Sequence, residues 1–329
     1  MLRLQTSNRN IATRILAGLV LFVCIAVPST ARALTVSPAR IEISGDPGQT
    51  VEGTFLLINE QGGSQKFYTS AQNFEAQGET GTPNFTSSTQ GLASWINTTS
   101  EVVLEKGEQR KVSYSITIPK DADAGGYFAA IFLSSVPPAV NGVSEVSVGA
   151  KIGTLILLRV SGEVKEGGGV ASFGTKENVR FYTSLPVMFN YRFTNDGGDR
   201  INPTGTIVLR NMIGLKSATL DANPSKGNVL PGSTRRFDIA WGEEQDASKT
   251  GFFAAVSHQW KSFALGIYMA KLGLTYGTSS TASEYTFVVV LPWQLLIVMI
   301  SIGSVVLWSA SRLIKRYNRW IIRSAQAQK

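Results

Sequence analysis

Residues 111–118, K-V-S-Y-S-I-T-I, alternate strictly between polar and apolar side chains. Val112, Tyr114 and Ile116 fall on one face of an extended chain, and the polar residues between them fall on the other. This period of two predicts a β-strand with one buried and one solvated face. Comparable runs occupy residues 34–43, 50–59, 65–73, 126–134 and 151–161, with turn signals such as Asp46-Pro47-Gly48 between them. Six short strands without a helical stretch of useful length predict a β-sandwich over residues 34–165.

The strand pattern resumes after Glu166-Gly167-Gly168-Gly169, whose consecutive glycines predict an irregular linker over residues 166–169. A glycine turn and strand at residues 106–118 recurs at 231–241, and a glycine-led strand at 125–131 recurs at 266–272. These loose copies predict a second sandwich over residues 170–286. The predicted fold class is therefore all-β, with two tandem immunoglobulin-like β-sandwiches. The aromatic and alanine-rich run 252–270 is long enough to contain a short helix.

Residues 287–310, FVVVLPWQLLIVMISIGSVVLWSA, contain no charged side chain. As a helix this stretch would be roughly 36 Å long, and the hydrocarbon core of a bilayer is about 30 Å thick. Trp293 and Trp308 lie near its two ends, where indole rings favour the boundary between water and lipid. The alternative, a buried core helix, would be shorter and would carry a polar face. The stretch predicts a transmembrane helix.

Charges on either side of the predicted exported part indicate its orientation. Residues 1–33 have the form of a signal peptide, with three arginines before the apolar run 15–27 and cleavage after Ala33, although a retained N-terminal anchor is the alternative. The tail 311–329 has no acidic residue, which indicates a cytoplasmic C-terminus and extracellular or periplasmic domains of a single-pass plasma-membrane protein. The basic residues that give this signal are Arg312, Lys315, Arg316, Arg319 and Arg323, followed by Lys329.

The charge and cysteine content of the exported part exclude two classes of protein. The chain has 31 basic and 23 acidic residues, but four basic residues lie in the signal peptide and six in the tail. The remaining 21 basic residues leave residues 34–286 at about −2, which argues against a nucleic-acid partner. The one cysteine, Cys24, lies in the signal peptide, so the exported part cannot form an internal disulfide.

The sequence offers little for catalysis. The one histidine, His258, has no neighbouring ligand or nucleophile and is predicted to be a packed or rim residue. Glu243, Glu244 and Asp246 are interpreted as a solvated loop in preference to a cation site. Phosphate-loop, dinucleotide and serine-hydrolase motifs are missing from the sequence. We expect no catalytic, cofactor or metal site, and hence no enzyme.

Two features are candidates for binding. Phe74 and Trp95 lie on either side of the polar stretch 76–91, which is predicted to be a long surface loop, and Phe85 lies within it. Aromatics beside polar loops recognise glycans or peptides. The alternative is that Phe74 and Trp95 close the end of the sandwich. The second candidate is a free strand edge, which can accept a partner strand by backbone pairing, although the sequence does not locate that edge.

Several short motifs in the first exported residues are similar to one bacterial family. They are Leu34-Thr35-Val36-Ser37-Pro38, Asp46-Pro47-Gly48-Gln49-Thr50, Leu57-Ile58-Asn59-Glu60, Leu104-Glu105-Lys106-Gly107-Glu108, Ile118-Pro119-Lys120 and Gly125-Gly126-Tyr127. Together they resemble the WxL-interacting surface proteins over about the first 130 exported residues. That resemblance implies a peptidoglycan-binding immunoglobulin-like domain, a second sandwich that engages a partner, and a C-terminal transmembrane helix. The same elements are also found in periplasmic pilus chaperones.

These observations predict a membrane-anchored, non-catalytic tether. Its exported domains would bind cell-wall polymer or a surface protein, while residues 287–310 hold it in the lipid bilayer. The alternative is a membrane-tethered chaperone or assembly factor that acts through β-strand edges. The oligomeric state is left open by the sequence.

Overall fold

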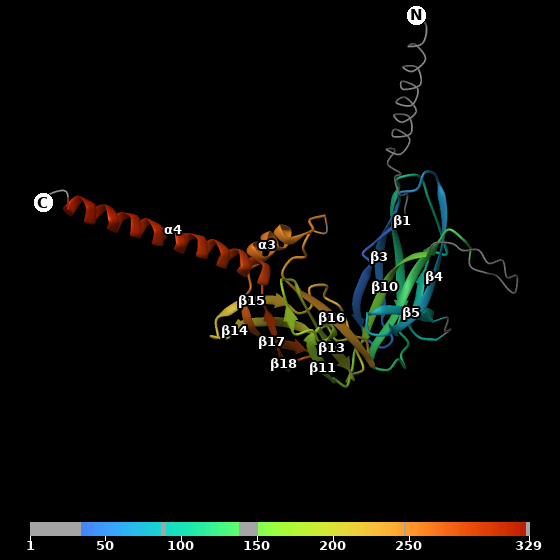
Figure 1. Ribbon diagram of the computed structural model, residues 1–329. Helices are drawn as coiled ribbons and strands as arrows, with labels where there is room; N and C mark the ends of the chain where they lie inside the picture. Colours follow the sequence, from blue (N-terminus) through green and yellow to red (C-terminus); the bar gives the residue numbers. More distant parts are fainter. Residues whose placement is uncertain (1–33, 87–89, 138–150, 247, 327–329) are drawn as a thin grey trace, which may run out of the picture.

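The computed structural model describes residues 34–86, 90–137, 151–246 and 248–326, with side chains up to Trp320. Within these residues the chain forms two β-sandwiches and a long C-terminal helix that projects from the second sandwich (Figure 1). This confirms the predicted all-β, immunoglobulin-like fold class. The predicted signal peptide, residues 1–33, lies outside the described residues, as does Asn141-Gly142, a dipeptide whose composition predicts the turn of a hairpin.

The first sandwich is built from two sheets, whose strands are interleaved along the chain. The smaller sheet has the order β1-β3-β8-β6, and the larger has the order β2-β10-β9-β4-β5, with β7 also paired to β4. The elements are β1 (Leu34–Ser37), β2 (Arg40–Gly45), β3 (Thr50–Asn59), β4 (Gln65–Gln77), β5 (Thr82–Thr86), α2 (Leu92–Trp95), β6 (Ile96–Thr98), β7 (Glu101–Leu104), β8 (Gln109–Thr117), β9 (Gly125–Ser134) and β10 (Lys151–Val160).

The core of the first sandwich lies between these sheets. It includes Phe55 of β3, Ile116 of β8, Ile131 of β9 and Leu158 of β10, all of which are almost completely buried. In β8 the apolar positions are buried and most of the polar ones exposed, as the alternation in residues 111–118 predicts. Each large apolar side chain buried in this way contributes about 1.5–3 kcal/mol to the free energy of folding.

The second sandwich repeats this plan with fewer strands. Its sheets have the orders β11-β13-β16 and β12-β18-β17-β14-β15. The elements are β11 (Gly168–Thr175), η1 (Lys176–Asn178), β12 (Phe181–Tyr182), β13 (Val187–Asn195), β14 (Thr204–Asn211), β15 (Lys216–Asp221), β16 (Ser233–Trp241), α3 (Phe252–Lys261), β17 (Gly266–Tyr276) and β18 (Ser280–Val290). The helix α3 lies in the run 252–270, where the composition allowed a short helix.

Equivalent strands of the two sandwiches carry the repeated sequence patterns. In both sandwiches the first strand divides between the sheets: β2 runs parallel to β10, and β12 runs parallel to β18. The similar segments 106–118 and 231–241 contain β8 and β16, and the similar segments 125–131 and 266–272 contain β9 and β17. Each pair occupies the same place in its sandwich, so the likeness in sequence reflects a likeness in topology.

The predicted glycine linker is wrong in detail, because Gly168 and Gly169 are the first two residues of β11. β11 pairs with β13, and a Cβ atom at Gly168 would lie 2.7 Å from the carbonyl oxygen of Thr194. Glycine therefore allows a close approach of two strand backbones at this position. From the sequence alone, consecutive glycines predict a flexible linker, because the pairing of β11 with β13 is not visible in the sequence.

The predicted surface loop over residues 76–91 is also corrected, since it contains the strand β5, which forms a hairpin with β4. Gly78 and Gly81 in the turn have φ values of 58° and 75°. Glycine adopts such left-handed conformations without the steric cost that other residues incur. The polar composition of this stretch therefore reflects the exposed residues of a hairpin and not an irregular loop.

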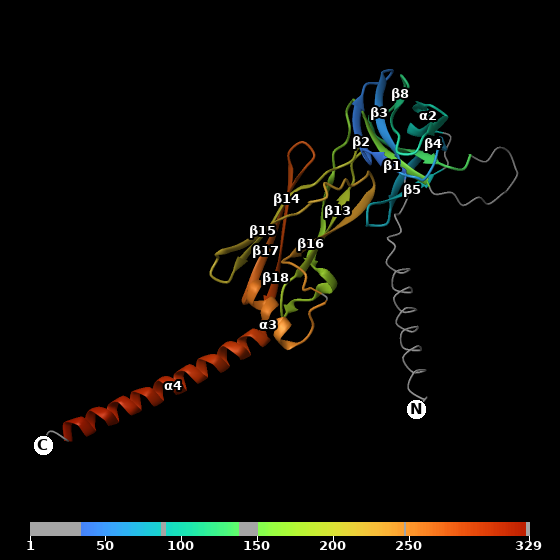
Figure 2. The ribbon, with the colours of Figure 1, turned by 90° about the horizontal axis from the view of Figure 1, so that it is seen from above.

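The C-terminal helix begins later than residue 287, where the transmembrane segment was predicted to start. Residues 287–290 complete β18, with Val288 and Val290 buried, and the helix α4 (Trp293–Gln326) starts after Pro292. Proline lacks the N–H group that a strand ladder needs, so the strand ends before it. Within the described residues, Trp293–Trp320 is long and apolar enough to cross a membrane. Five of the basic residues predicted to lie in a tail, Arg312 to Arg323, are on this same helix, which points away from both sandwiches (Figure 2), and Lys329 lies outside the described residues.

Candidate functional site

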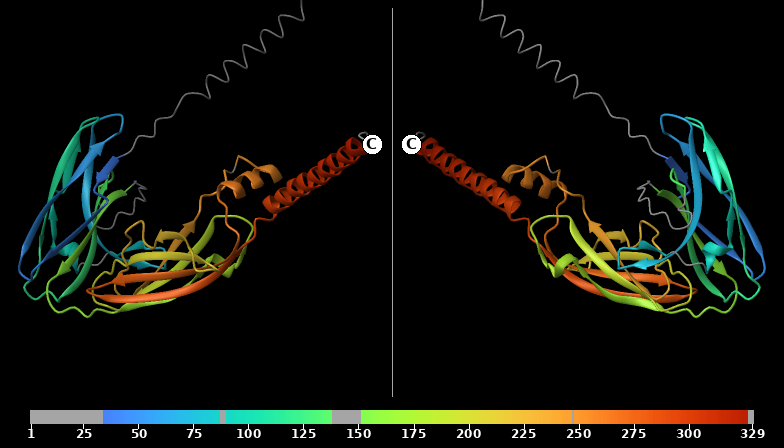
Figure 3. Two further views of the ribbon diagram at one scale, coloured as in Figure 1. Left: turned by 90° about the vertical axis from the view of Figure 1, so that its left-hand side faces the viewer. Right: turned by 90° about the vertical axis from the view of Figure 1, so that its right-hand side faces the viewer.

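The two sandwiches meet at one end of each (Figure 3), and polar contacts join them at this junction. The turn of the β4–β5 hairpin reaches the second sandwich, where the carbonyl oxygen of Glu79 accepts a hydrogen bond from the backbone N–H of Arg236 at 2.7 Å. The Glu79 carboxylate also pairs with the guanidinium of Arg192 at 2.7 Å. On the other side of the junction the N–H of Gly126 donates to the carbonyl oxygen of Gly198 at 2.9 Å.

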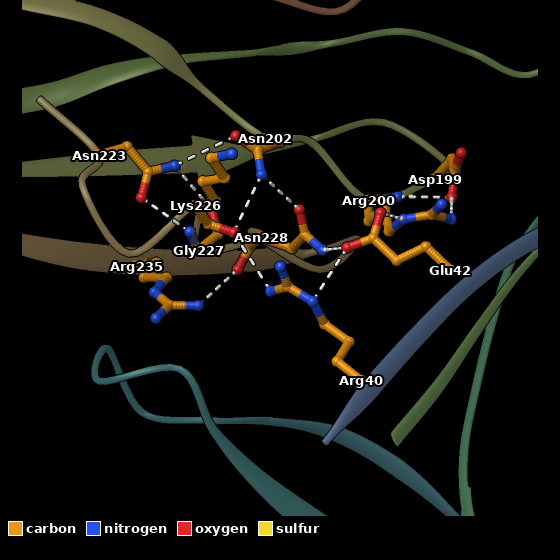
Figure 4. Close-up of polar contacts among 10 residues, drawn as sticks. All are labelled: Arg40, Glu42, Asp199, Arg200, Asn202, Asn223, Lys226, Gly227, Asn228 and Arg235. Carbon is orange, nitrogen blue, oxygen red and sulfur yellow. Dashed lines mark hydrogen bonds and ion pairs between the residues drawn. The ribbon is translucent and has the colours of Figure 1, made fainter. Parts of the chain in front are cut away.

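Glu42 on β2 is the central acceptor of this junction (Figure 4). It pairs with Arg40 at 3.1 Å and with Arg200 of the second sandwich at 3.3 Å, and it accepts a hydrogen bond from the Asn228 amide at 2.9 Å. Burial alone would raise the pKa of Glu42, but the Asn228 hydrogen bond and the charges of Arg200 and Arg40 outweigh it and lower that pKa. Two of these three contacts, those to Arg200 and Asn228, join the two sandwiches.

A buried asparagine shapes the loop that supplies these contacts. The side chain of Asn223 donates to the carbonyl oxygens of Pro203 and Gly227 and accepts from the Gly227 N–H, at distances of 2.7–3.0 Å. This brings the Lys226 carbonyl oxygen to 3.2 Å from the Arg40 guanidinium and places Asn228 against Glu42 (Figure 4). Buried amides that satisfy several backbone groups in this way specify one loop conformation.

A small pocket lies at the junction between Phe74 and Leu155 of the first sandwich and Arg235 of the second. Its volume is about 70 Å³, far below the roughly 300 Å³ that small-molecule sites need. Arg235 donates to the Asn228 carbonyl oxygen at 2.8 Å, and burial, together with the nearby charge of Arg40, lowers its pKa. The pocket is suited to water and does not have the size of a metabolite site.

Four phenylalanines gather on the outer face of the larger sheet of the first sandwich, and we call Phe74, Phe85, Phe128 and Phe132 the aromatic face. The ring centroids of Phe85 and Phe132 are 4.7 Å apart, those of Phe74 and Phe85 are 5.9 Å apart, and those of Phe74 and Phe128 are 6.0 Å apart. Phe74 is buried, whereas 37% of Phe85 is exposed. The outer face of an antiparallel sheet is ordinarily polar, so a cluster of apolar rings there indicates a contact surface.

The structure brings together two of the three aromatic residues predicted to bind a ligand. Phe74 and Phe85 touch each other on the aromatic face, but Trp95 lies in α2, where its ring is 4.6 Å from that of Tyr127. Tyr127 and Trp95 pack against the core, on the opposite side of β9 from Phe128. The contacts of Trp95 match the alternative in which it closes the sandwich. A ligand-binding role for these residues stays a prediction.

Sequence reasoning missed Phe128 and Phe132, although a signal was present. Residues 125–134, G-G-Y-F-A-A-I-F-L-S, are apolar at both odd and even positions. In a half-solvated strand only one of these sets is buried in the core. An unbroken apolar run in a two-sheet sandwich therefore signals that the outer face of the strand is also in contact with something.

An open strand edge lies two strands away from β4, beside the aromatic face. β9 accompanies β10 from Lys151 onward, whereas β2 accompanies it only from Leu155 onward. The Leu155 N–H donates to Ala39 on the β2 side, so the N–H groups of Lys151 and Gly153 point to that side as well. Among the described residues no strand pairs with them there. Gly153 also lies opposite Phe132, so the edge and the aromatic face adjoin.

A second, polar surface lies on the outer face of the smaller sheet. A shallow groove with a volume of about 660 Å³ runs over β3, β8 and β6, and its lining includes Glu52, Thr54, Asn97, Ser113 and Ser115. Hydroxyl, amide and carboxylate groups of this kind can bond the hydroxyls of a sugar. The side chains that line the groove are mostly polar, unlike those of the aromatic face.

The predicted packing of His258 is confirmed. Its Nε2 lies 2.7 Å from the carbonyl oxygen of Leu185, and the side chain is partly buried in α3. In the parts of the chain that the structure describes, no three His, Cys, Asp or Glu side chains are grouped as a metal site. Asp246, predicted to lie in a solvated loop, forms local bonds to Ser248 and Lys249.

Comparisons with known proteins are limited to the fold. No protein-family model and no curated protein matches the sequence. The class 5 fimbriae chaperone CfaA is 11% identical, with 78% of this chain and 99% of that chain covered and a TM-score of 0.38. The E. coli chaperone DraB is 10% identical, with 78% and 97% covered and a TM-score of 0.32. The Salmonella enterica SafA pilin in complex with the SafB chaperone is 10% identical, with 79% of this chain and 98% of that chain covered and a TM-score of 0.33.

Proposed function

We propose that this chain is a membrane-anchored, non-catalytic binding protein that holds an extended segment of a protein partner along its first sandwich. The observation that carries the proposal is the adjacency of the aromatic face to the open edge of β10. The edge would supply backbone hydrogen bonds to the segment, and the aromatic face would receive its apolar side chains. This is the mode of action of an assembly factor or chaperone that works through strand edges.

The chemistry of the aromatic face favours a protein segment. Its four rings are phenylalanines, which have no polar group to bond the hydroxyls of a sugar. Apolar rings packed edge to face form pockets for aliphatic or aromatic side chains. The N–H groups of Lys151 and Gly153, with which no described strand pairs on the β2 side, match the repeat of a strand backbone. Natural proteins protect such edges, so an open one beside an apolar surface supports the binding of a strand.

The anchor in this proposal is α4, with Trp293–Trp320 as the span. Arg312, Lys315, Arg316 and Arg319 all lie in the C-terminal half of the helix. We infer that this half faces the cytoplasm, because basic residues remain preferentially on that side. The guanidinium of Arg312 lies 4.0 Å from the ring centroid of Trp308, a contact suited to the boundary of the membrane.

The test is photo-crosslinking in cells that produce the full chain. A photoreactive amino acid would replace Gln72, on the outer face of β4, or Lys151, at the open edge, with Lys106 in the β7–β8 turn as the control position. We expect the same crosslinked protein from positions 72 and 151 and none from position 106. Equal crosslinking from all three positions, or none from the first two, would refute the proposal.

Cell-wall polymer is the second candidate ligand, supported by the polar groove over β3, β8 and β6. The resemblance to the WxL-interacting surface proteins also implies peptidoglycan binding. Full-length protein in lipid nanodiscs would be pelleted with purified wall sacculi. If the groove binds polymer, Asn97→Ala should weaken pelleting and Phe85→Asp should not. Failure of the wild type to pellet would exclude this candidate and leave the protein partner.

A further inference from the structure

Exposed apolar side chains gather at one end of the second sandwich, where α4 begins. β18 ends at Val290, which pairs with Gly266 at the start of β17. β14 ends at Asn211, which pairs with Tyr268, so the β14–β15 turn emerges at this same end. Phe181 of β12 lies there too, beside the last residues of β18. Figures 1 and 2 show α3 beside the first residues of α4 and the β14–β15 turn projecting from the same end of the sandwich.

We call six of these side chains the apolar end patch, and most of each is exposed. They come from β12, the β14–β15 turn and α3: Phe181, Met212, Ile213, Leu215, Phe253 and Trp260. Phe253 is 81% exposed and Trp260 is 67% exposed. These two residues and Ser257 between them follow the spacing of one helix face, so α3 turns an aromatic face outward. Large apolar groups clustered in this way mark a contact surface.

α3 is fastened to the beginning of α4 by one buried side chain. Gln259 is 2% exposed, donates to the carbonyl oxygen of Thr183 at 3.0 Å and to the side chain of Gln294, and accepts from the Leu295 N–H at 2.9 Å. The rings of Phe252 and Trp293 are 6.4 Å apart in the same contact. The outward face of α3 is therefore held beside the first turn of the candidate membrane span.

This position identifies the occupant of the patch. If α4 crosses the bilayer, the lipid headgroups lie at its N-terminal end, which is also the position of the apolar end patch. Tryptophan and phenylalanine are favoured at that depth, about 5–10 Å into the boundary between headgroups and acyl chains. Lys216 follows the β14–β15 turn and Lys261 ends α3, and both can extend toward lipid phosphates. The exposed Glu243 and Glu244 lie in the loop before α3, so apolar contact and not net charge carries the attraction.

We propose that the apolar end patch rests in the headgroup region of the bilayer, so that the second sandwich docks on the membrane in addition to being anchored to it. This inference rests on the proposed anchoring by α4. Its occupant is lipid, because the patch is continuous with the start of the span. A protein partner at this end is an outcome that the test separates.

Three serines allow a matched set of environment-sensitive labels in full-length protein. In a Cys24→Ser background, an NBD fluorophore would be attached at Ser257→Cys in α3, Ser301→Cys within α4, or Ser279→Cys at the opposite end of the β17–β18 sheet. The protein would be reconstituted into phosphatidylcholine–phosphatidylglycerol vesicles. Quenching by lipids that carry a spin label near the headgroup would be compared with quenching by lipids labelled near the acyl-chain end.

We expect the label at 257 to be quenched more strongly by the shallow spin label, the label at 301 more strongly by the deep one, and the label at 279 by neither. Quenching at 301 with none at 257 would overturn the docking and leave the anchor intact. No quenching at 301 would remove the anchor, and the docking with it.

A second variant separates specific docking from mere closeness to the membrane. Phe253→Glu combined with Trp260→Glu changes two exposed positions and leaves the Gln259 contacts in place. We expect the shallow quenching at 257 to fall several-fold while quenching at 301 is unchanged. Unchanged quenching at 257 in this variant would show that α3 lies near the bilayer without using the patch, which would contradict the proposal.

Discussion

Glu42 in the first sandwich and Arg200 in the second form an ion pair across the junction, with 3.3 Å between Oε2 and Nε. Arg200 is largely buried, with 14% of its side chain exposed. We expect Arg200→Ala to lower the free energy of unfolding by about 1.5 kcal/mol, since hydrogen bonds to charged groups contribute about that much. Chemical denaturation would measure the change.

The surface pair between Arg110 and Glu108 is a matched control for this prediction. Both side chains lie on the first sandwich, and they are 47% and 29% exposed, more than the 14% of Arg200. Arg110→Ala should therefore lower the free energy of unfolding by no more than about 0.5 kcal/mol, because exposed pairs contribute little. Equal losses for the two alanine variants would show that the junction pair has no special role.

The same carboxylate makes the junction sensitive to acid. Because the pKa of Glu42 is lowered in the folded state, the folded protein binds this proton less tightly than the unfolded chain does. The contribution of Glu42 to stability is thus present above its pKa in the unfolded chain, about 4.3. It is lost as the pH falls through its lower pKa in the folded protein. We expect Glu42→Gln to be less stable than the wild type at neutral pH, with the gap closing below about pH 4. A gap independent of pH in denaturation experiments would contradict this cause.

The open edge of β10 can be blocked with a single residue. Lys151→Pro removes an N–H that points away from β9, so the pairing with β9 keeps its hydrogen bonds. We expect this variant to lose the crosslink formed from position 72, while Lys151→Ala keeps it. If both variants crosslink equally, the backbone edge does not bind the partner.

The aromatic face should tolerate no charge if it receives apolar side chains. Phe85→Asp places a carboxylate beside Phe132 and should weaken partner binding roughly 30-fold, the loss of about 2 kcal/mol typical of an interface hot spot. Val103→Asp is the control, because Val103 is 44% exposed and lies on β7, away from the four rings. The crosslink yield at graded expression levels would measure both. A similar loss for Val103→Asp would indicate a general effect on the fold.

Alanine substitution of two glycines, Gly205 and Gly169, should have different effects on the free energy of unfolding. Gly205 in β14 has a φ of 156°, and a Cβ atom there would lie 2.0 Å from the carbonyl oxygen of Gly273. Gly205→Ala should therefore lower the free energy of unfolding by more than about 2 kcal/mol. Gly169 has no atom within 4 Å of an added Cβ, so Gly169→Ala should be neutral or slightly stabilising. Denaturation midpoints of the two variants would decide between them.

Sequence periodicity was sufficient for most strands and insufficient wherever long-range contacts decide. The alternation in residues 111–118 predicts β8 because its two faces have different environments. β5 was missed because a polar hairpin is held by its pairing with β4 and its turn by the second sandwich, neither of which is visible locally. The start of α4 was predicted too early because residues 287–290 are all apolar, and such a run fits a buried strand as well as a membrane helix.

The candidate site was predicted only in part for the same reason. Phe74 and Phe85 stood out as aromatics near polar residues, but their contact with Phe128 and Phe132 depends on the pairing of β4, β5 and β9. The junction was invisible, since Glu42 and Arg200 are 158 residues apart in the sequence. Only the structure shows that, among the described residues, no strand pairs with Lys151 and Gly153 on the β2 side of β10.

The hydrogen bonds of Gln259 have a mechanical consequence. They join the first turn of α4 to the body of the second sandwich, and the junction at Glu42 joins that sandwich to the first. A force applied at the aromatic face would then exert a torque on α4, because the connections between them are rigid. A flexible linker would transmit only tension. Time-resolved anisotropy of a label on the first sandwich should show one slow rotational component shared with α4. Tilting of the helix in the bilayer would swing the far end of the chain through a wide arc.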